Sequence, residues 1–258
     1  MNFSAVPYHS WLGRVLRFPL RLLPPETIVP ILQGRLRGKR WIVGSGNHGC
    51  WLGSYEYEKR RAFEQTISAG NIVFDVGAHV GFYTLLASTL VGPTGRVVAF
   101  EPAPRNLRYL KEHLRLNRVK NVDVVACAVL ESTGVAWFED GVDSSSGRVS
   151  ATGQYRVSTI GLDEYVKQTA RVPDCIKIDV EGAECSVLMG ATSILRQHHP
   201  AIFLATHGRA THERSCEVLR ALGYDLHAMV GESVEQTDEL FARTADSSPR
   251  WGIGQLER

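Results

Sequence analysis

Apolar runs and helical patterns alternate along the middle of this chain, between about residues 72 and 206. The apolar runs are short and rich in β-branched residues, which is typical of buried strands. We predict five strands, at residues 72–76, 97–101, 122–127, 175–179 and 201–206. Between them, LLASTL, NLRYLKEHLRLN and CSVLMGATSILRQ have the spacing of helices. This alternation favours a parallel sheet with helices on both faces.

The segment between Gly134 and Leu162 breaks the alternation. The helix expected after the third strand is missing there, and two strand-like pieces flank the polar loop EDGVDSSSGRVSATGQ. Such a loop near the ligand edge of the sheet is either a mobile lid or a plain surface insertion. The next helical pattern is regular again, and five of its apolar residues form one core-facing stripe: Val187, Leu188, Ala191, Ile194 and Leu195.

The N-terminal region has a different pattern. Residues 1–40 mix large apolar residues with arginines and contain five prolines. We favour an arm packed on its own domain or on a second subunit over a peripheral membrane contact, because the prolines interrupt any long amphipathic helix. A strand, a glycine-rich turn and a helix through EYEKRRAFEQTI should follow. We therefore divide the chain into an arm and hairpin (1–50), a main domain (51–245) and a tail (246–258).

Composition narrows the class of protein. The chain has 258 residues, of which 44% are hydrophobic, and 29 basic residues nearly balance 27 acidic ones. This balance does not call for nucleic acid as a partner. The 5 cysteines include no CxxC pair, which favours reduced thiols and a cytoplasmic location. We predict neither export nor a transmembrane span, because no signal-peptide pattern is present and no apolar run approaches about 20 residues.

Four side chains with useful chemistry lie at or just past the ends of predicted strands. These are Asp75, Glu101, Asp179 and His207, each on a different strand. In a parallel sheet, ligands bind beyond the carboxyl ends of the strands, at the point where the strand order reverses. We therefore expect the four side chains to share one functional edge, although each alone could cap a helix or face solvent.

The turn after the first of these strands, VFDVGAHVGFYT, narrows the choice of ligand. It has Gly77 and Gly81 with three residues between them, so it lacks the G-x-G-x-x-G spacing of a dinucleotide site. It suits a ligand with a ribose but no pyrophosphate. Glu101 can accept hydrogen bonds from both ribose hydroxyls. S-adenosylmethionine has such a ribose, and its amino acid end could meet Asp75 through bridging groups and the N–H groups of a helix that opens at Phe82.

Six stretches match a known family in order and spacing: WLGSYE, FDVGAHVGFYTLLA, GRVVAFEPAPRN, LRLN, ACAV and KIDVEGAECSVLMGA. Through them, residues 35–245 resemble the FkbM-type S-adenosylmethionine-dependent methyltransferases. The resemblance implies a class I methyltransferase fold, which is a Rossmann-like three-layer α/β sandwich. Its seven-stranded sheet should be mostly parallel, with one antiparallel strand. It also implies methyl transfer to a hydroxyl of a natural product, sugar or glycolipid.

The resemblance further implies a set of cofactor-binding residues: Tyr55, Asp75, Gly77, Ala78, His79, Gly81, Thr84, Glu101, Ala128 and Asp179. Two positions depart from the family pattern. Relatives more often have Asn at position 79; His and Asn both tolerate the left-handed region, so we predict that His79 acts through its backbone and not as a base. Near Thr206, many relatives have an acidic residue.

Methyl transfer to an alcohol needs a destination for the hydroxyl proton, and the sequence offers two. His207 could accept it as a general base. Alternatively, a divalent cation such as Mg²⁺, held by Asp179 with Glu181 or Glu184, could lower the pKa of the hydroxyl. We predict a catalytic role for Asp179 in both cases. We favour the metal-independent reaction with His207 as base, because the end of the fifth strand supplies no second carboxylate.

The sequence thus predicts an O-methyltransferase acting on a saccharide or another small molecule. An N-methyltransferase on the same scaffold and a catalytically silent cofactor-binding partner are the alternatives. A catalytically silent protein is disfavoured, because cofactor binding alone would need Glu101 but not Asp179 and its neighbours. The identity of the acceptor and the presence of a homo-oligomer are left open.

Overall fold

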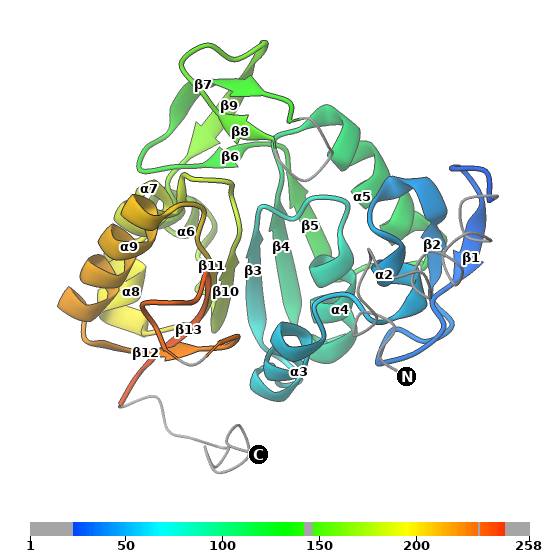
Figure 1. The fold of residues 1–258 in the computed structure, drawn as a ribbon, viewed down its shortest axis with the longest axis horizontal. Coiled ribbons are helices and arrows are strands. Elements are labelled where there is room, and N and C mark those ends of the chain that lie inside the picture. The colour runs from blue at the N-terminus through cyan, green and yellow to red at the C-terminus, as the bar shows by residue number, and fades with distance from the viewer. Residues whose placement is uncertain (1–22, 142–146, 232, 246–258) are drawn as a thin grey trace.

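The computed structural model describes residues 23–141, 147–231 and 233–245 (Figure 1). Its centre is a seven-stranded sheet of order β12-β13-β11-β10-β3-β4-β5. The strands are β3 (Ile72–Val76), β4 (Arg96–Phe100), β5 (Val122–Val125), β10 (Cys175–Ile178), β11 (Ala201–Ala205), β12 (Tyr224–Ala228) and β13 (Glu239–Thr244). Neighbouring strands from β5 to β11 pair in parallel, whereas β13 is antiparallel to both β11 and β12. The predicted sheet with one antiparallel strand is confirmed, and so are all five predicted strands.

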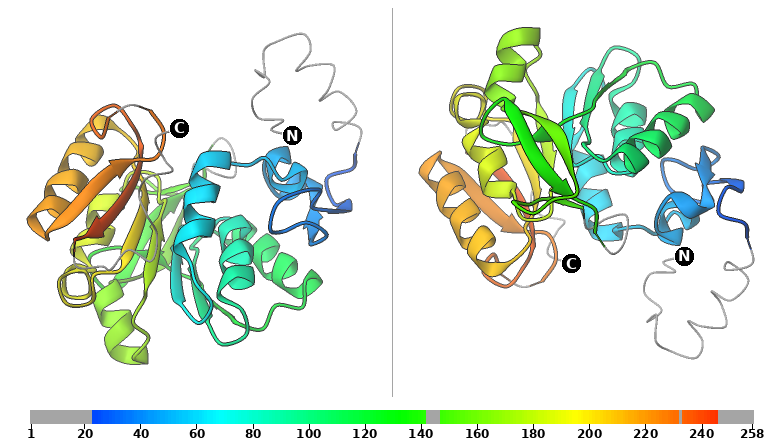
Figure 2. Two further views of the ribbon diagram at one scale, coloured as in Figure 1. Left: turned by 90° about the horizontal axis from the view of Figure 1, so that it is seen from below. Right: turned by 90° about the horizontal axis from the view of Figure 1, so that it is seen from above.

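Helices cover both faces of this sheet (Figures 1 and 2). On one face lie α3 (Tyr57–Thr66), α4 (Phe82–Val91) and α5 (Pro104–Leu116); on the other lie α6 (Leu162–Thr169), α7 (Glu184–Met189), α8 (Thr192–His198) and α9 (Arg209–Ala221). Successive side chains of each strand point to opposite faces of the sheet. Val73 packs toward α4, while Phe74 and Val76 pack toward α6 to α9. Because both faces are covered, the central strands are apolar throughout, and a charged residue in them marks a special position.

A second, four-stranded sheet lies beyond the carboxyl ends of the central strands, at the top of Figure 1. Its order is β6-β9-β7-β8, formed by β6 (Ala128–Val129), β9 (Tyr155–Ile160), β7 (Gly134–Glu139) and β8 (Arg148–Val149). It replaces the missing helix after the third strand, as the sequence predicts. Residues 142–146 of the polar loop lie outside the described residues, so the choice between a mobile lid and a plain surface insertion stays open.

The apolar stripe of the last helical pattern is divided between α7 and α8. All five of its residues are buried as predicted, but the helix is interrupted at Gly190 and Ala191. The carbonyl of Gly190 accepts a hydrogen bond from the backbone N–H of Asp163. The Asp163 carboxylate in turn accepts from the N–H groups of Ser193 and Ile194. The first turn of α8 is therefore satisfied by α6, which makes a separate helix stable.

The described part of the N-terminal arm packs on its own domain. It contains the hairpin of β1 (Ile28–Pro30) and β2 (Arg40–Ile42), the 3₁₀ turn η3 (Val43–Ser45) and the short helix α2 (His48–Leu52). Trp41 is fully buried and stacks on His113 of α5, with 3.8 Å between ring centroids. Residues 1–22 and the tail from 246 on lie outside the described residues. Within the described ranges, no helix is long and apolar enough to cross a membrane.

Candidate active site

The turn between β3 and α4 has an unusual backbone. Gly77, His79 and Gly81 have positive φ values of 74°, 52° and 92°. A side chain at Gly77 would collide with the carbonyl oxygen of Asp179 on the neighbouring strand, so only glycine fits there. His79 occupies the left-handed region, as predicted. The turn thereby lies directly against the end of β10.

Glu101, just after β4, holds this turn in place. Its Oε2 accepts the backbone N–H of His79 at 2.8 Å, and its Oε1 accepts the backbone N–H of Ala103 at 2.9 Å and the amide of Asn106 at 3.3 Å. Only 4% of Glu101 is exposed. Burial raises the pKa of Glu101, and these three hydrogen bonds act against that rise. The carboxylate has room to accept a further hydrogen bond from a ligand.

A pocket lies over this edge of the sheet. Five of the predicted site residues line it: Gly77, His79, Glu101, Ala128 and Asp179. The second sheet supplies an apolar wall through Phe138 and Val149. Sequence reasoning missed Phe138 and Val149, because the polar loop gave no register for the strands beside it.

Other predicted residues lie beneath or beside the turn and not in the pocket wall. Asp75 and Thr84 are fully buried, and the Thr84 hydroxyl donates to Asp75 Oδ2 at 2.6 Å. Tyr55 packs edge-on against Phe82, with 5.2 Å between centroids. Ala78 and Gly81 also lie outside the pocket lining. Burial leaves Asp75 no direct contact with a ligand in this arrangement, and its cofactor role stays a prediction.

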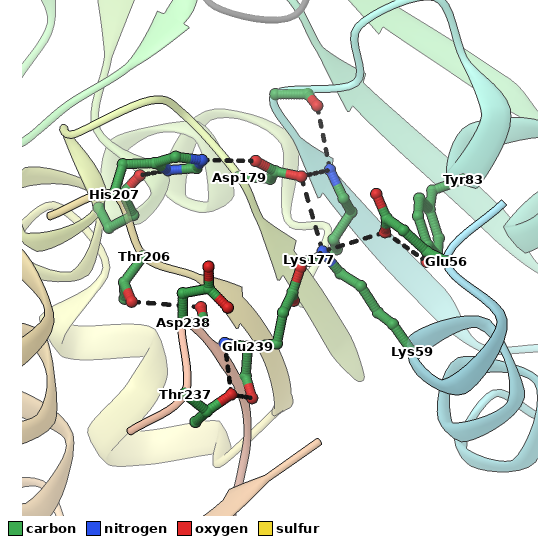
Figure 3. Close-up of polar contacts among 12 residues, drawn as sticks. Glu56, Lys59, Tyr83, Lys177, Asp179, Thr206, His207, Thr237, Asp238 and Glu239 are labelled. Atoms are coloured by element: carbon green, nitrogen blue, oxygen red, sulfur yellow. Dashed lines mark hydrogen bonds and ion pairs between the residues drawn. The ribbon is translucent and has the colours of Figure 1, made fainter. Parts of the chain in front are cut away.

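Asp179 is the centre of a charged network, shown in Figure 3. Its Oδ2 lies 3.5 Å from Lys177 Nζ and 3.7 Å from Lys59 Nζ, while its Oδ1 lies 3.8 Å from His207 Nε2. Burial acts to raise the pKa of Asp179, but the two ammonium groups and His207 outweigh it and hold that pKa well below its usual range. Asp179 is therefore a carboxylate.

The two lysines are themselves buried and have several partners. Lys177 stands opposite Asp75 in the β10–β3 register, 3.5 Å from Asp75 Oδ1, and donates to the Gly77 carbonyl at 3.1 Å. Lys59 pairs with Glu239 at 2.9 Å and with Glu56 at 3.3 Å. The sequence contained one signal of this network, a lysine within the buried run CIKI. The contacts of Lys59, Glu56 and Glu239 come from segments far apart in sequence and have no local signature.

His207 follows β11 and is surrounded by carboxylates. Its Nδ1 is hydrogen-bonded to Glu184 Oε1 at 2.8 Å, and its Nε2 lies 3.5 Å from Glu181 Oε1. The hydrogen bond to Glu184, helped by Glu181 and Asp179, raises the pKa of His207 to about 9 despite partial burial. The structure thus brings together His207 and all three carboxylates named from the sequence. The general-base role of His207 stays a prediction.

The model of the methyltransferase FkbM domain matches residues 75–226 of this chain. The match covers more than half of the sequence and contains the turn, Glu101 and the Asp179–His207 region. This chain belongs to the FkbM methyltransferase family. The predicted class I methyltransferase fold agrees with this membership.

One curated relative has a named activity. The hexuronic acid methyltransferase AglP of Haloferax volcanii is 31% identical to this chain over 130 residues. The matched region is 49% of this chain and 52% of AglP. The chain therefore spans about half the length of that protein.

Two solved structures share the fold. One is the methyltransferase FkbM from Methylobacillus flagellatus, with a TM-score of 0.51 and 23% identity over 69% of this chain and 44% of that one. The other is described as an rRNA methylase from Clostridium thermocellum, with a TM-score of 0.50 and 13% identity over 75% of this chain and 96% of that one. At these identities the similarity concerns the fold.

Proposed function

We propose that this protein transfers a methyl group from S-adenosylmethionine to a hydroxyl group of a saccharide, with sugars that carry a uronic acid as the first acceptors to test. Membership of the FkbM family supports methyl transfer. The named activity of the AglP relative supports a saccharide acceptor. The observation that carries the proposal is the continuity of the site: Asp179 lines the same pocket as Glu101 and also contacts the His207 group.

The residues around the pocket fit the cofactor. Glu101 offers a buried carboxylate to the ribose hydroxyls. Gly77 lets the turn lie against the carbonyl of Asp179, which keeps the turn and the end of β10 together. Ala128, Phe138 and Val149 supply apolar surface suited to an adenine ring. When bound, S-adenosylmethionine supplies a methyl group on a sulfonium, which an oxygen nucleophile can attack directly.

Asp179 and His207 are proposed to act on the acceptor. Both side chains are partly exposed, at 26% and 35%, so a hydroxyl can reach them. The acceptor hydroxyl is held by Asp179, and its proton has two routes. It passes to Nε2 of His207 in the fraction of molecules whose ring is neutral, a fraction that grows as the pH rises toward the pKa of about 9. Alternatively, it passes to water from a hydroxyl whose pKa a bound cation has lowered. Replacing His207 with Ala is expected to lower turnover by about 10²- to 10⁴-fold.

The test is an assay with S-adenosylmethionine labelled in its methyl group. Saccharides with and without a uronic acid are compared as acceptors, a cell extract is added as an untargeted source, and the labelled product is analysed by mass spectrometry. We expect label on a saccharide, in a methyl ether that survives mild alkali. The Asp179→Ala and His207→Ala variants should lose the activity, whereas Glu213→Ala, at an exposed position on α9, should keep it.

The product also separates the alternatives. Label released by mild alkali indicates a methyl ester and contradicts a hydroxyl acceptor. Label on nitrogen contradicts it as well and indicates an N-methyltransferase. A protein that binds the cofactor but labels no product contradicts the enzymatic role and favours a silent cofactor-binding partner.

A further inference from the structure

Three side chains from two strand ends converge beside the pocket. Asp179 and Glu181 follow β10, and His207 follows β11. One carboxylate oxygen of each acid and one ring nitrogen of His207 lie within 4.8 Å of one another. We propose that Asp179, Glu181 and His207 bind a divalent cation, which in turn binds the acceptor hydroxyl. This inference rests on the proposed methyl transfer for its purpose, but the cation site itself can be tested independently.

The separations are close to those of ligands that share one ion. Ligand atoms about 2.1 Å from an octahedral ion are about 3.0 Å apart when adjacent and about 4.2 Å apart when opposite. His207 Nε2 lies 3.5 Å from Glu181 Oε1 and 3.8 Å from Asp179 Oδ1, between these two limits. By contrast, N–H···O hydrogen bonds usually have heavy atoms about 2.7–3.2 Å apart. Small side-chain shifts would therefore bring the ligand atoms to one shared ion, and the two measured separations are too long for short hydrogen bonds.

Glu184 provides an independent indication of an ion at this point. Its side chain is fully buried, and its Oε1 accepts hydrogen bonds from His207 Nδ1 at 2.8 Å and from the backbone N–H of Gly182 at 2.9 Å. Its Oε2 has no hydrogen-bond partner among the described residues. A carboxylate that holds one ring nitrogen is the usual support of a metal-binding histidine, because it fixes the ring and turns the other nitrogen toward the ion. Here that other nitrogen is Nε2.

The two oxygens of Asp179 divide their roles, as Figure 3 shows. Oδ2 faces the ammonium groups of Lys177 and Lys59, whereas Oδ1 faces His207. The lysines thus keep Asp179 in a fixed orientation, and Oδ1 is directed toward the proposed ion. The side chains of Glu181 and His207 are 27% and 35% exposed, so the remaining coordination positions are open to water or an acceptor.

The ligand set indicates the kind of ion and its use. Two carboxylates with one imidazole suit first-row divalent cations such as Mn²⁺ or Zn²⁺, as well as the hard ion Mg²⁺ with less preference. A bound ion lowers the pKa of a coordinated hydroxyl, so that water can take the acceptor proton and no side-chain base is required. In this role His207 is a ligand of the ion and is not the direct proton acceptor.

The test is a titration of the metal-stripped full chain with Mn²⁺ alone, followed by calorimetry and by the electron paramagnetic resonance of free Mn²⁺. We expect one saturable site. Glu181→Gln and His207→Gln should each weaken it at least about 10-fold, as loss of a ligand or its support does. Glu213→Gln, an exposed acid on α9, should leave the affinity unchanged. Thermal unfolding of each variant confirms that it is folded.

The outcomes separate this inference from the proposed function. No saturable Mn²⁺ binding at millimolar concentration, or equal binding by wild type and Glu181→Gln, overturns the cation site. S-adenosylhomocysteine binding by the wild type is measured in parallel with EDTA present, so that the cofactor pocket is tested without a cation. If S-adenosylhomocysteine binds but Mn²⁺ does not, only the cation site fails. If Mn²⁺ binds but S-adenosylhomocysteine does not, the proposed methyl transfer fails instead.

Discussion

Single residues at this site combine a structural and a chemical task. Lys177 is a cation inside a buried strand, and it contacts Asp75, Asp179 and the carbonyl of Gly77. It therefore joins the turn after β3 to the end of β10, which are the two parts of the proposed site. Glu101 also has two tasks: its carboxylate accepts the backbone N–H of His79, and it lines the pocket.

Loss of Lys177 should strongly destabilise the fold. In Lys177→Met the aliphatic part of the side chain is kept, but Asp75 and Asp179 lose a buried counter-charge. Breaking a buried ion pair on one side typically costs about 3–5 kcal/mol. We expect a loss of this order in the free energy of unfolding, measured by urea denaturation. Lys111→Met, on the exposed side of α5, should change it by less than about 0.5 kcal/mol. Equal stabilities of the two variants would contradict a structural role for the Lys177 charge.

His79 should matter through its backbone. His79→Asn and His79→Gly are expected to keep S-adenosylhomocysteine affinity within about 3-fold, because both residues accept the left-handed region. His79→Val should weaken binding and lower the melting temperature, since a β-branched residue is strained at φ 52°. Calorimetry on the three variants checks this. Equal loss in all three would indicate that the imidazole ring itself is required.

Among the elements, the central strands were predictable and the connections were not. Strands such as β3 and β10 are buried on both faces, so apolar runs with β-branched residues locate them within one or two residues. The break between α7 and α8 depends on Asp163 from another helix, and the short helix α2 has no apolar periodicity of its own. Tertiary contacts decide such features, and a local pattern does not contain them.

The same distinction applies to the candidate site. Asp75, Glu101, Asp179 and His207 could be named because the carboxyl ends of parallel strands meet at one edge. Lys59, Glu56 and Glu239 could not, because α3 and β13 reach Asp179 only in the folded chain. The end of β11 supplies no second carboxylate, but in the structure Glu181 lies near His207 from the loop after β10.

The contact between the N-terminal hairpin and α5 should make stability depend on pH. His113 is buried between Trp41 and Tyr109; its Nδ1 bonds to the Val80 carbonyl, and its Nε2 accepts the N–H of Ile42. Burial lowers the pKa of His113 from 6.5 to about 4, while Val80 and the nearby Glu112 act against it. As the pH falls, His113 is therefore protonated in the unfolded chain at a higher pH than in the folded chain. The contribution of neutral His113 to the free energy of unfolding is fully present above about pH 6.5. It is lost as the pH drops toward 4, by at most about 1.4 kcal/mol per pH unit.

Urea denaturation at pH 7, 6 and 5 measures this slope. His113→Gln should be less stable at pH 7 but should show a flatter dependence on pH. His198→Gln, at an exposed position, should keep the slope of the wild type. Parallel curves for wild type and His113→Gln would assign the dependence to other groups.

For the whole molecule, the fold combines two sites on one sheet edge. The turn after β3, Glu101 and the second sheet form a pocket suited to a cofactor, and the ends of β10 and β11 form an acidic site suited to an acceptor and a cation. Asp179 belongs to both. The family is established by the match over residues 75–226, and the cofactor is the claim on which every proposed step depends.

Calorimetric titration with S-adenosylhomocysteine and, separately, with NAD tests that claim most directly. We predict that the wild type binds one equivalent of S-adenosylhomocysteine and does not bind NAD. Glu101→Ala should weaken binding by about 1.5–3 kcal/mol, the range for a hydrogen bond to a charged group. Glu217→Ala, an exposed acid on α9, should bind like the wild type. Binding of NAD without binding of S-adenosylhomocysteine, or an unchanged affinity in Glu101→Ala, would contradict the account.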